Sequence, residues 1–159
     1  MNDGGCACGA VRYRLTTGPL FVHCCHCTTC QTETGSAFVI NALIETDRVR
    51  LSRGTPSAVL TPSDSGKGQT VMRCPTCHVA LWSHYAGMGP RFAFVRVGTL
   101  DAPARVAPDI HIYTRSKLPW VVLPDNVPAV EEYYSRSHQW PADSLARHAA
   151  VLARDAPPR

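Results

Sequence analysis

The chain has no long apolar run, no dense block of one charge and no internal repeat. None of its segments approaches the ~18 consecutive apolar residues that a membrane-spanning helix requires. Met1 is followed directly by Asn2-Asp3-Gly4-Gly5, without the basic and apolar regions of a secretory signal peptide. We therefore expect a cytoplasmic protein that does not contact a membrane.

Basic residues only slightly outnumber acidic ones. The sequence contains 16 Lys and Arg residues against 12 Asp and Glu residues, a net charge of +4 at pH 7. The basic residues are scattered singly, whereas a nucleic-acid-binding surface is normally denser in positive charge. A nucleic acid is therefore not expected as a partner, and the charge says nothing about oligomeric state.

Short runs of β-forming residues recur along the chain. The 13 prolines and 11 glycines indicate many turns between short elements. Residues 10–16 alternate, with Val11, Tyr13 and Leu15 on one face. Further runs that indicate strands are residues 37–43, 49–51, 58–60, 69–73, 79–84, 92–97 and 110–113, and residues 63–68 indicate a loop tip. A chain of 159 residues with this pattern is typical of one mainly β domain, an antiparallel sandwich or barrel.

The C-terminal tail has a different composition. Residues 144–154 favour a helix, and Asp143 or Ser144 is positioned to cap it. Residues 157–159 are expected to fray. The fold class that follows is mainly β with a short C-terminal helix.

Cysteine is the residue type that carries the functional signal. Seven of the eight cysteines fall into a C-x-C pair, a C-x-x-C pair and a C-x-C-x-x-C run. The members are Cys6 and Cys8, then Cys74 and Cys77, and between them Cys25, Cys27 and Cys30. In a cytosolic protein, closely spaced cysteines are more often metal ligands or catalytic groups than disulfides.

The two pairs together form a four-cysteine set, Cys6, Cys8, Cys74 and Cys77. Each pair can chelate as a unit, and four thiolates suit a tetrahedral, closed zinc site. Such a site would pin the N-terminal strand to the middle of the chain and contribute directly to folding stability. The simpler alternative is four buried cysteines that act as small apolar residues.

The run supplies a three-cysteine set, Cys25, Cys27 and Cys30, placed on a tight turn and the start of a short helix. Three thiolates on Zn²⁺ leave a net charge of −1 and one open position, where an exogenous thiol can bind as thiolate. Cys24 can replace Cys25 as a ligand, and His26 or another histidine can close the site. Redox chemistry between neighbouring cysteines is a further alternative.

The arrangement of these residues resembles the glutathione-dependent formaldehyde-activating enzyme family, which includes centromere protein V. The segments that carry the resemblance are Gly4-Gly5-Cys6-Ala7-Cys8-Gly9, Cys25-His26-Cys27-x-x-Cys30, Cys74-Pro75-Thr76-Cys77 and Ile110-His111-Ile112-Tyr113-x-x-Ser116-Lys117-x-Pro119-Trp120. The resemblance covers residues 4–135, which we expect to form one zinc-binding domain. Residues 136–159 are then a C-terminal extension.

The resemblance implies a mainly β fold pinned by two Zn²⁺ ions per chain. It implies a structural zinc at the four-cysteine set and a catalytic zinc at the three-cysteine set, with Cys25 rather than Cys24 as the first ligand. Cys24 then remains a bystander thiol. The implied activity joins glutathione and formaldehyde into S-hydroxymethylglutathione, a carbon–sulfur lyase reaction in reverse. One departure is His78, because the family usually has glycine after the second pair.

Two further residue assignments follow as expectations. Ser36, His111 and Lys117 are candidate donors to a developing alkoxide, and Trp120 is a candidate pocket wall. The expected function is a zinc-dependent carbon–sulfur lyase-like enzyme that acts on a thiol adduct, with glutathione as the candidate substrate. The alternatives are a non-catalytic, zinc-stapled module that binds nucleic acid or protein, and a thiol-redox or metal-trafficking protein.

Overall fold

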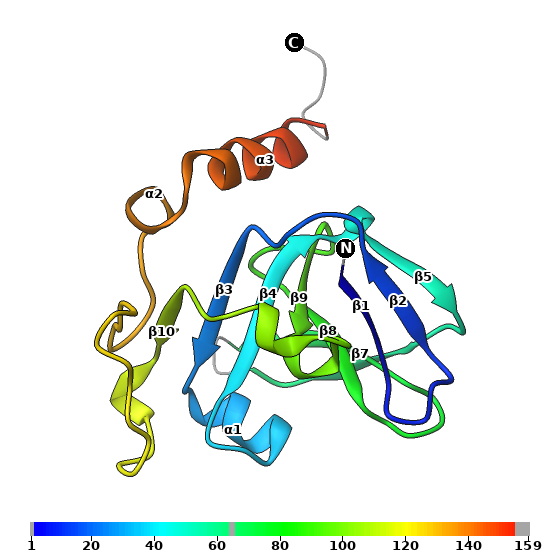
Figure 1. Ribbon diagram of the computed structural model, residues 1–159, viewed down its shortest axis with the longest axis horizontal. Helices are drawn as coiled ribbons and strands as arrows, with labels where there is room; N and C mark the ends of the chain where they lie inside the picture. Colours follow the sequence, from blue (N-terminus) through cyan, green and yellow to red (C-terminus); the bar gives the residue numbers. More distant parts are fainter. Residues whose placement is uncertain (1, 64–65, 155–159) are drawn as a thin grey trace.

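The computed structural model describes residues 2–63 and 66–154, whose strands form a smaller and a larger sheet (Figure 1). The smaller sheet is antiparallel and has the order β1 (Asn2–Gly5), β2 (Arg12–Leu15), β5 (Val49–Arg53). The larger sheet has the order β10 (Ile110–Ile112), β3 (Phe21–Cys25), β4 (Val39–Glu45), β9 (Phe92–Arg96), β8 (Ala80–Tyr85), β7 (Gln69–Arg73), β6 (Ser57–Thr61).

All neighbouring strands of the larger sheet are antiparallel except β10 and β3, which pair in parallel. The helices are α1 (Thr28–Thr34), α2 (Arg136–Gln139) and α3 (Ala142–Ala153). Single 3₁₀ turns occur at Thr46–Arg48, Val97–Thr99, Pro103–Arg105 and Thr114–Ser116. The mainly β fold in two sheets with a short C-terminal helix, predicted from the sequence, is confirmed.

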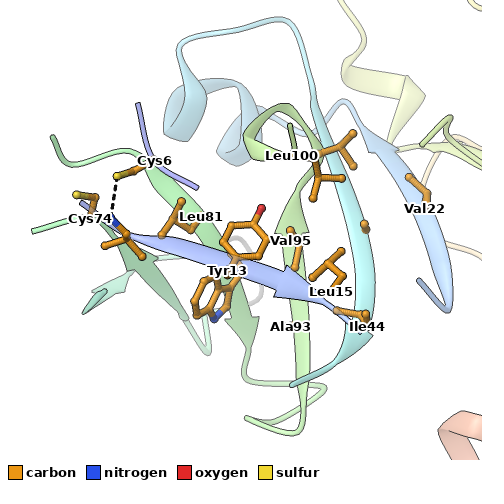
Figure 2. Packing of buried hydrophobic residues seen from close by; sticks show 14 residues of the cluster. Cys6, Tyr13, Leu15, Val22, Ile44, Cys74, Leu81, Ala93, Val95 and Leu100 are labelled. Carbon is orange, nitrogen blue, oxygen red and sulfur yellow. Dashed lines mark hydrogen bonds between the residues drawn. The ribbon is translucent and has the colours of Figure 1, made fainter. Parts of the chain in front are cut away.

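The first core lies between the two sheets. The alternation predicted for residues 10–16 is confirmed, because Val11, Tyr13 and Leu15 are all buried. Tyr13 and Leu15 of β2 lie over Leu81 and Val95 of the larger sheet (Figure 2). Burying one face of β2 while its other face stays polar fixes the strand in this register.

A second core covers the opposite face of the larger sheet. It contains Leu43, Phe92 and Phe94 from the sheet, together with Trp140 and Val151 from the C-terminal segment. The larger sheet is therefore packed on both faces. Because this second core includes Cys25 and Cys30, the three-cysteine set lies on the face that the C-terminal segment helps to cover.

Helix α3 is held at the end of the larger sheet where β3 begins and β4 ends (Figure 1). Ser144 donates its hydroxyl to the carbonyl of Leu20 at 2.6 Å. The predicted cap is wrong, because the N-cap residue is Pro141 and no side chain caps the helix. Neither this helix nor any other in the described residues has the length and apolar character needed to cross a membrane. Residues 157–159, expected to fray, lie outside the described residues, as do residues 64 and 65 of the expected loop.

Two strands were not expected from the sequence. Strand β1 has the sequence Asn-Asp-Gly-Gly, which lacks β-forming side chains. Strand β3 has the sequence Phe-Val-His-Cys-Cys and is buried on both faces, so it shows no polar–apolar alternation. The site described below begins at the end of this second strand.

We expect Arg147→Met in α3 to destabilise the protein by about 2–3 kcal/mol, because it leaves the Glu45 carboxylate buried without its ion partner. The Glu45 side chain is 4% exposed and accepts from Arg147 Nε at 2.9 Å and Nη2 at 2.6 Å. Chemical denaturation measures the change. Arg154→Met in the same helix is the control, since its ion pair with Asp47 is exposed and should contribute at most about 1 kcal/mol. Equal effects of the two substitutions would contradict this account.

Candidate functional site

The four-cysteine set is assembled from two hairpin-like turns far apart in the sequence. Its four sulfur atoms all lie within 4.8 Å of one another. Cys8 Sγ is 3.5 Å from Cys6 Sγ and 3.7 Å from Cys74 Sγ. The amide of Val11 donates to Cys6 Sγ at 3.2 Å (Figure 2). The amide of Thr76 likewise donates to Cys74 Sγ at 3.4 Å. Four sulfurs that converge at this spacing, two of them accepting from backbone amides, form a donor set that suits tetrahedral zinc.

His78 occupies the turn of the second pair in a left-handed backbone conformation, with φ of +60°. Its amide donates to the carbonyl of Cys74 at 3.0 Å, and this hydrogen bond closes the turn from Cys74 to His78. Left-handed backbone costs a residue with a Cβ roughly 1–2 kcal/mol relative to glycine. The departure at His78 therefore preserves the turn and adds local backbone strain.

The three-cysteine set lies where β3 passes into α1. Cys25 is the last residue of β3, Cys27 is the N-cap of α1, and Cys30 lies in the first turn of the helix. Their sulfur atoms converge within 4.8 Å, with 3.4 Å between Cys25 Sγ and Cys27 Sγ. The structure thus brings together the three residues predicted from the sequence, and it places Cys24 on the other face of the strand.

The environment of this set favours one thiolate at Cys27. Contacts with Cys25 and Cys30 lower the pKa of Cys27 to about 3, and the backbone amides of Cys30 and Thr29 also stabilise the charged sulfur. The contact with Cys27 raises the pKa of Cys25, and burial adds to this. A site with one resident thiolate and two further thiols is prepared to bind a thiophilic metal ion.

The three-cysteine set opens onto a cavity of about 1010 Å³. This volume is at the upper end of the range for small-molecule binding sites. The Tyr85 hydroxyl lies 3.9 Å from Cys30 Sγ at the cavity wall. Burial raises the pKa of Tyr85, so its phenol stays protonated and can act as a hydrogen-bond donor. The cavity gives the three-cysteine set the access to a ligand that a closed site lacks.

A histidine–tyrosine pair joins β3 to the C-terminal segment at this cavity. Trp140 Nε1 donates to the Tyr134 hydroxyl at 2.7 Å, and that hydroxyl is 2.5 Å from His23 Nε2. The indole can only donate, so the tyrosine hydroxyl accepts from Trp140 and also forms a hydrogen bond with His23. Burial lowers the pKa of His23 to about 4, which keeps the imidazole neutral.

A buried arginine lies on the same face of the larger sheet as the three-cysteine set. Arg96 of β9 is 5% exposed and donates from Nη1 to Asn41 Oδ1, while Asn41 itself lines the cavity. Its Nε and Nη2 find no hydrogen-bond partner, and among residues 2–63 and 66–154 no carboxylate forms an ion pair with it. Contact with Cys25 lowers the pKa of Cys30, but contact with Cys27 and burial outweigh it and raise the pKa to about 11; the guanidinium charge of Arg96 opposes this rise. An uncompensated buried cation is costly, so this site is built for a net negative charge.

A third cluster lies on the opposite face of β3. Cys24, His26 and His111 are buried, and their donor atoms lie within 4.8 Å of one another. His26 Nε2 is 2.9 Å from His111 Nδ1 and 3.6 Å from Cys24 Sγ. The hydrogen bond between the two rings satisfies a buried ring nitrogen of His111, and this side chain does not line the cavity.

The other candidates proposed from the sequence do not line the cavity. Ser36 and Trp120 are exposed, and the Lys117 ammonium donates to the carbonyls of Leu118 and Val121. The residues that do line it and escaped sequence reasoning include His23, Tyr85 and Tyr134. No local motif marks them, because each reaches the cavity through a contact distant in sequence.

Comparison with known proteins gives a family match over most of the chain. The family model described as "Glutathione-dependent formaldehyde-activating enzyme" matches residues 1–116. A search of the curated proteins found no match. Among solved structures, one similar chain is a Rhodobacter sphaeroides protein of 21% sequence identity. The match covers 80% of this chain and 99% of that chain, with a TM-score of 0.49.

We expect Arg96→Met to weaken zinc binding at the three-cysteine set by about 10- to 100-fold, the range for loss of an outer-shell partner of a metal site. Three thiolates on Zn²⁺ carry a net charge of −1, which Arg96 would balance. Competition with a zinc chelator measures the affinity. Arg96→Lys, which keeps the charge, should recover part of it, and Arg14→Met on the smaller sheet is the control. An unchanged affinity in Arg96→Met would rule out this role.

Proposed function

This chain belongs to the glutathione-dependent formaldehyde-activating enzyme family, and we propose on that basis that it is a zinc-dependent enzyme acting on the carbon–sulfur bond of a thiol adduct. The candidate reaction joins glutathione and formaldehyde into S-hydroxymethylglutathione, or releases them again. The observation that carries the proposal is the three-cysteine set, which opens onto a cavity of about 1010 Å³. A purely structural metal site has no need of such a cavity.

The proposal assigns different roles to the two cysteine sets. The four-cysteine set would hold a structural zinc that ties residues 6–8 to residues 74–77. The three-cysteine set would hold the catalytic zinc. The donor chemistry supports both assignments, because thiolate sulfur is a preferred zinc ligand and each set converges within 4.8 Å.

Zinc at the three-cysteine set would supply a Lewis-acidic position at which a substrate thiol loses its proton to water and binds as thiolate. In the forward direction the substrate sulfur bonds to the carbonyl carbon, the π electron pair moves onto oxygen, and the oxygen takes a proton from water, so that the net transfer is one proton from sulfur to oxygen through the solvent. Tyr85 is positioned beside Cys30 to donate a hydrogen bond to that oxygen as its negative charge develops. His23 and Tyr134 hold the cavity wall through their 2.5 Å contact.

We expect Cys27→Ser to abolish turnover of glutathione and formaldehyde while the fold persists. The substitution removes the most acidic thiol of the set and should reduce the zinc content from two ions per chain to one. Metal analysis and product detection by NMR measure both effects. Cys24→Ser is the matched control and should retain two zinc ions and activity.

A folded, fully active Cys27→Ser protein would refute the proposal. A wild-type protein that binds two zinc ions but turns over no thiol adduct would support the non-catalytic binding module instead. Three zinc ions in the wild type, reduced to two in Cys24→Ser, would show that the Cys24, His26 and His111 cluster also binds metal.

Tyr85→Phe should lower kcat by about 100-fold with little change in KM for the thiol, because the hydroxyl interacts with charge that develops only in the transition state. Steady-state kinetics on the zinc-loaded protein give both constants. Tyr113→Phe, which removes a hydroxyl from another tyrosine of the cavity lining, should change neither constant by more than a few-fold. Equal loss in both variants would argue against a specific role for Tyr85.

A further inference from the structure

One wall of the cavity comes from beyond the residues that match the family model. The match ends at residue 116, whereas Tyr133, Tyr134, Ser135, Arg136 and Ser137 all line the cavity. The wall and the metal-ligand candidates are therefore contributed by different parts of the chain. The matched part supplies the cysteines, and the downstream segment supplies a surface that a substrate contacts.

This wall is fixed in place by specific contacts. The Tyr133 and Tyr134 rings stack with their centroids 4.7 Å apart. The His23 ring stacks on Tyr134 with the centroids 5.6 Å apart and forms a hydrogen bond with its hydroxyl. His23 lies two residues before Cys25 on β3, with its side chain on the same face. The downstream segment is thus held at a defined position relative to the three-cysteine set.

Apart from the Cys27 thiolate, the charged side chains that line the cavity in the described part of the chain are cationic. They are Arg115 and Arg136, and among residues 2–63 and 66–154 no Asp or Glu lines the cavity. Arg115 already forms an ion pair with Glu132 at 2.5 Å. The arginines of the lining therefore favour a ligand that carries a negative charge.

Of the two arginines that line the cavity, Arg136 has no carboxylate partner among residues 2–63 and 66–154. Its Nη1 donates to neutral acceptors, His148 Nε2 at 2.9 Å and Met88 Sδ at 3.4 Å. Its guanidinium carbon lies 5.9 Å from the centre of the Trp140 ring. These contacts orient the guanidinium and leave its charge uncompensated. A carboxylate is the group that a guanidinium binds in a bidentate, charge-assisted geometry.

We propose that the downstream wall selects the substrate of this site, with Arg136 binding a carboxylate that the thiol substrate carries at a distance from its sulfur. This inference rests on the proposed function, since it places the substrate sulfur at the three-cysteine set. Glutathione, the thiol of the proposed reaction, carries such carboxylates, and a cavity of about 1010 Å³ has room for a thiol of that size. Tyr133 and Tyr134 provide the flat surface along which the body of the thiol lies.

The test compares glutathione with its diethyl ester, whose carboxylates are blocked, on the zinc-loaded full chain. Equilibrium binding is measured by calorimetry and turnover with formaldehyde by NMR. We expect the wild type to prefer glutathione by about 10- to 100-fold in both KM and Kd, the contribution of a charged hydrogen-bonded pair. Arg136→Gln should lose that preference through weaker glutathione binding, with the ester unaffected.

Arg154→Gln, an exposed arginine paired with Asp47 away from the cavity lining, is the matched control and should behave as the wild type. A wild type that binds both ligands equally, or binds neither, overturns the inference, and so does an Arg136→Gln protein that retains the preference. Binding that depends on Arg136 without any turnover would reject the proposed reaction and leave the carboxylate site standing. Turnover of glutathione and of its diethyl ester at equal efficiency would support the proposed reaction and reject the carboxylate site.

Discussion

The register of β3 between β4 and β10 is the constraint on which the site depends. Cys25 pairs with Val39 on one side and with Ile112 on the other, while Cys24 pairs with Ile40 and His111. Because side chains alternate along a strand, a slip of one residue would exchange the faces of Cys24 and Cys25. Packing on both faces of the sheet prevents that slip. The pairing thereby decides which cysteine joins Cys27 and Cys30.

The two faces of β3 give neighbouring cysteines different chemistry. Cys25 faces the cavity side and meets two other sulfurs, whereas Cys24 faces the first core and contacts a hydrogen-bonded histidine pair. Burial raises the pKa of Cys24 to about 12, so its thiol stays protonated. One strand thus separates a cluster suited to a ligand-accessible metal from a buried polar cluster.

The sequence was informative where the signal is local. The grouping of the cysteines, the alternation around Tyr13 and the helix near residues 144–154 could all be predicted, because each depends on residues close in sequence. Strand β3 was missed because burial on both faces removes its periodicity. Tyr85 and Tyr134 were missed because only the paired strands and the returning C-terminal segment bring them to the cavity. His111 was singled out for its motif, but its side chain lies on the other face.

The cysteines of one set are close together in the sequence and those of the other are far apart, and this difference sets the order in which the two sites can form. The three-cysteine set spans six residues, Cys25 to Cys30, so an unfolded chain can already chelate a metal ion there. The four-cysteine set joins Cys8 to Cys74 across 66 positions, and it forms only when the two sheets come together. A ligand that binds the unfolded chain adds little to stability. A metal ion at the four-cysteine set would therefore stabilise the folded state. A metal ion at the three-cysteine set would bind before folding and would add little to the free energy of unfolding. The cavity is completed last, because the contact of His23 with Tyr134 spans 111 positions.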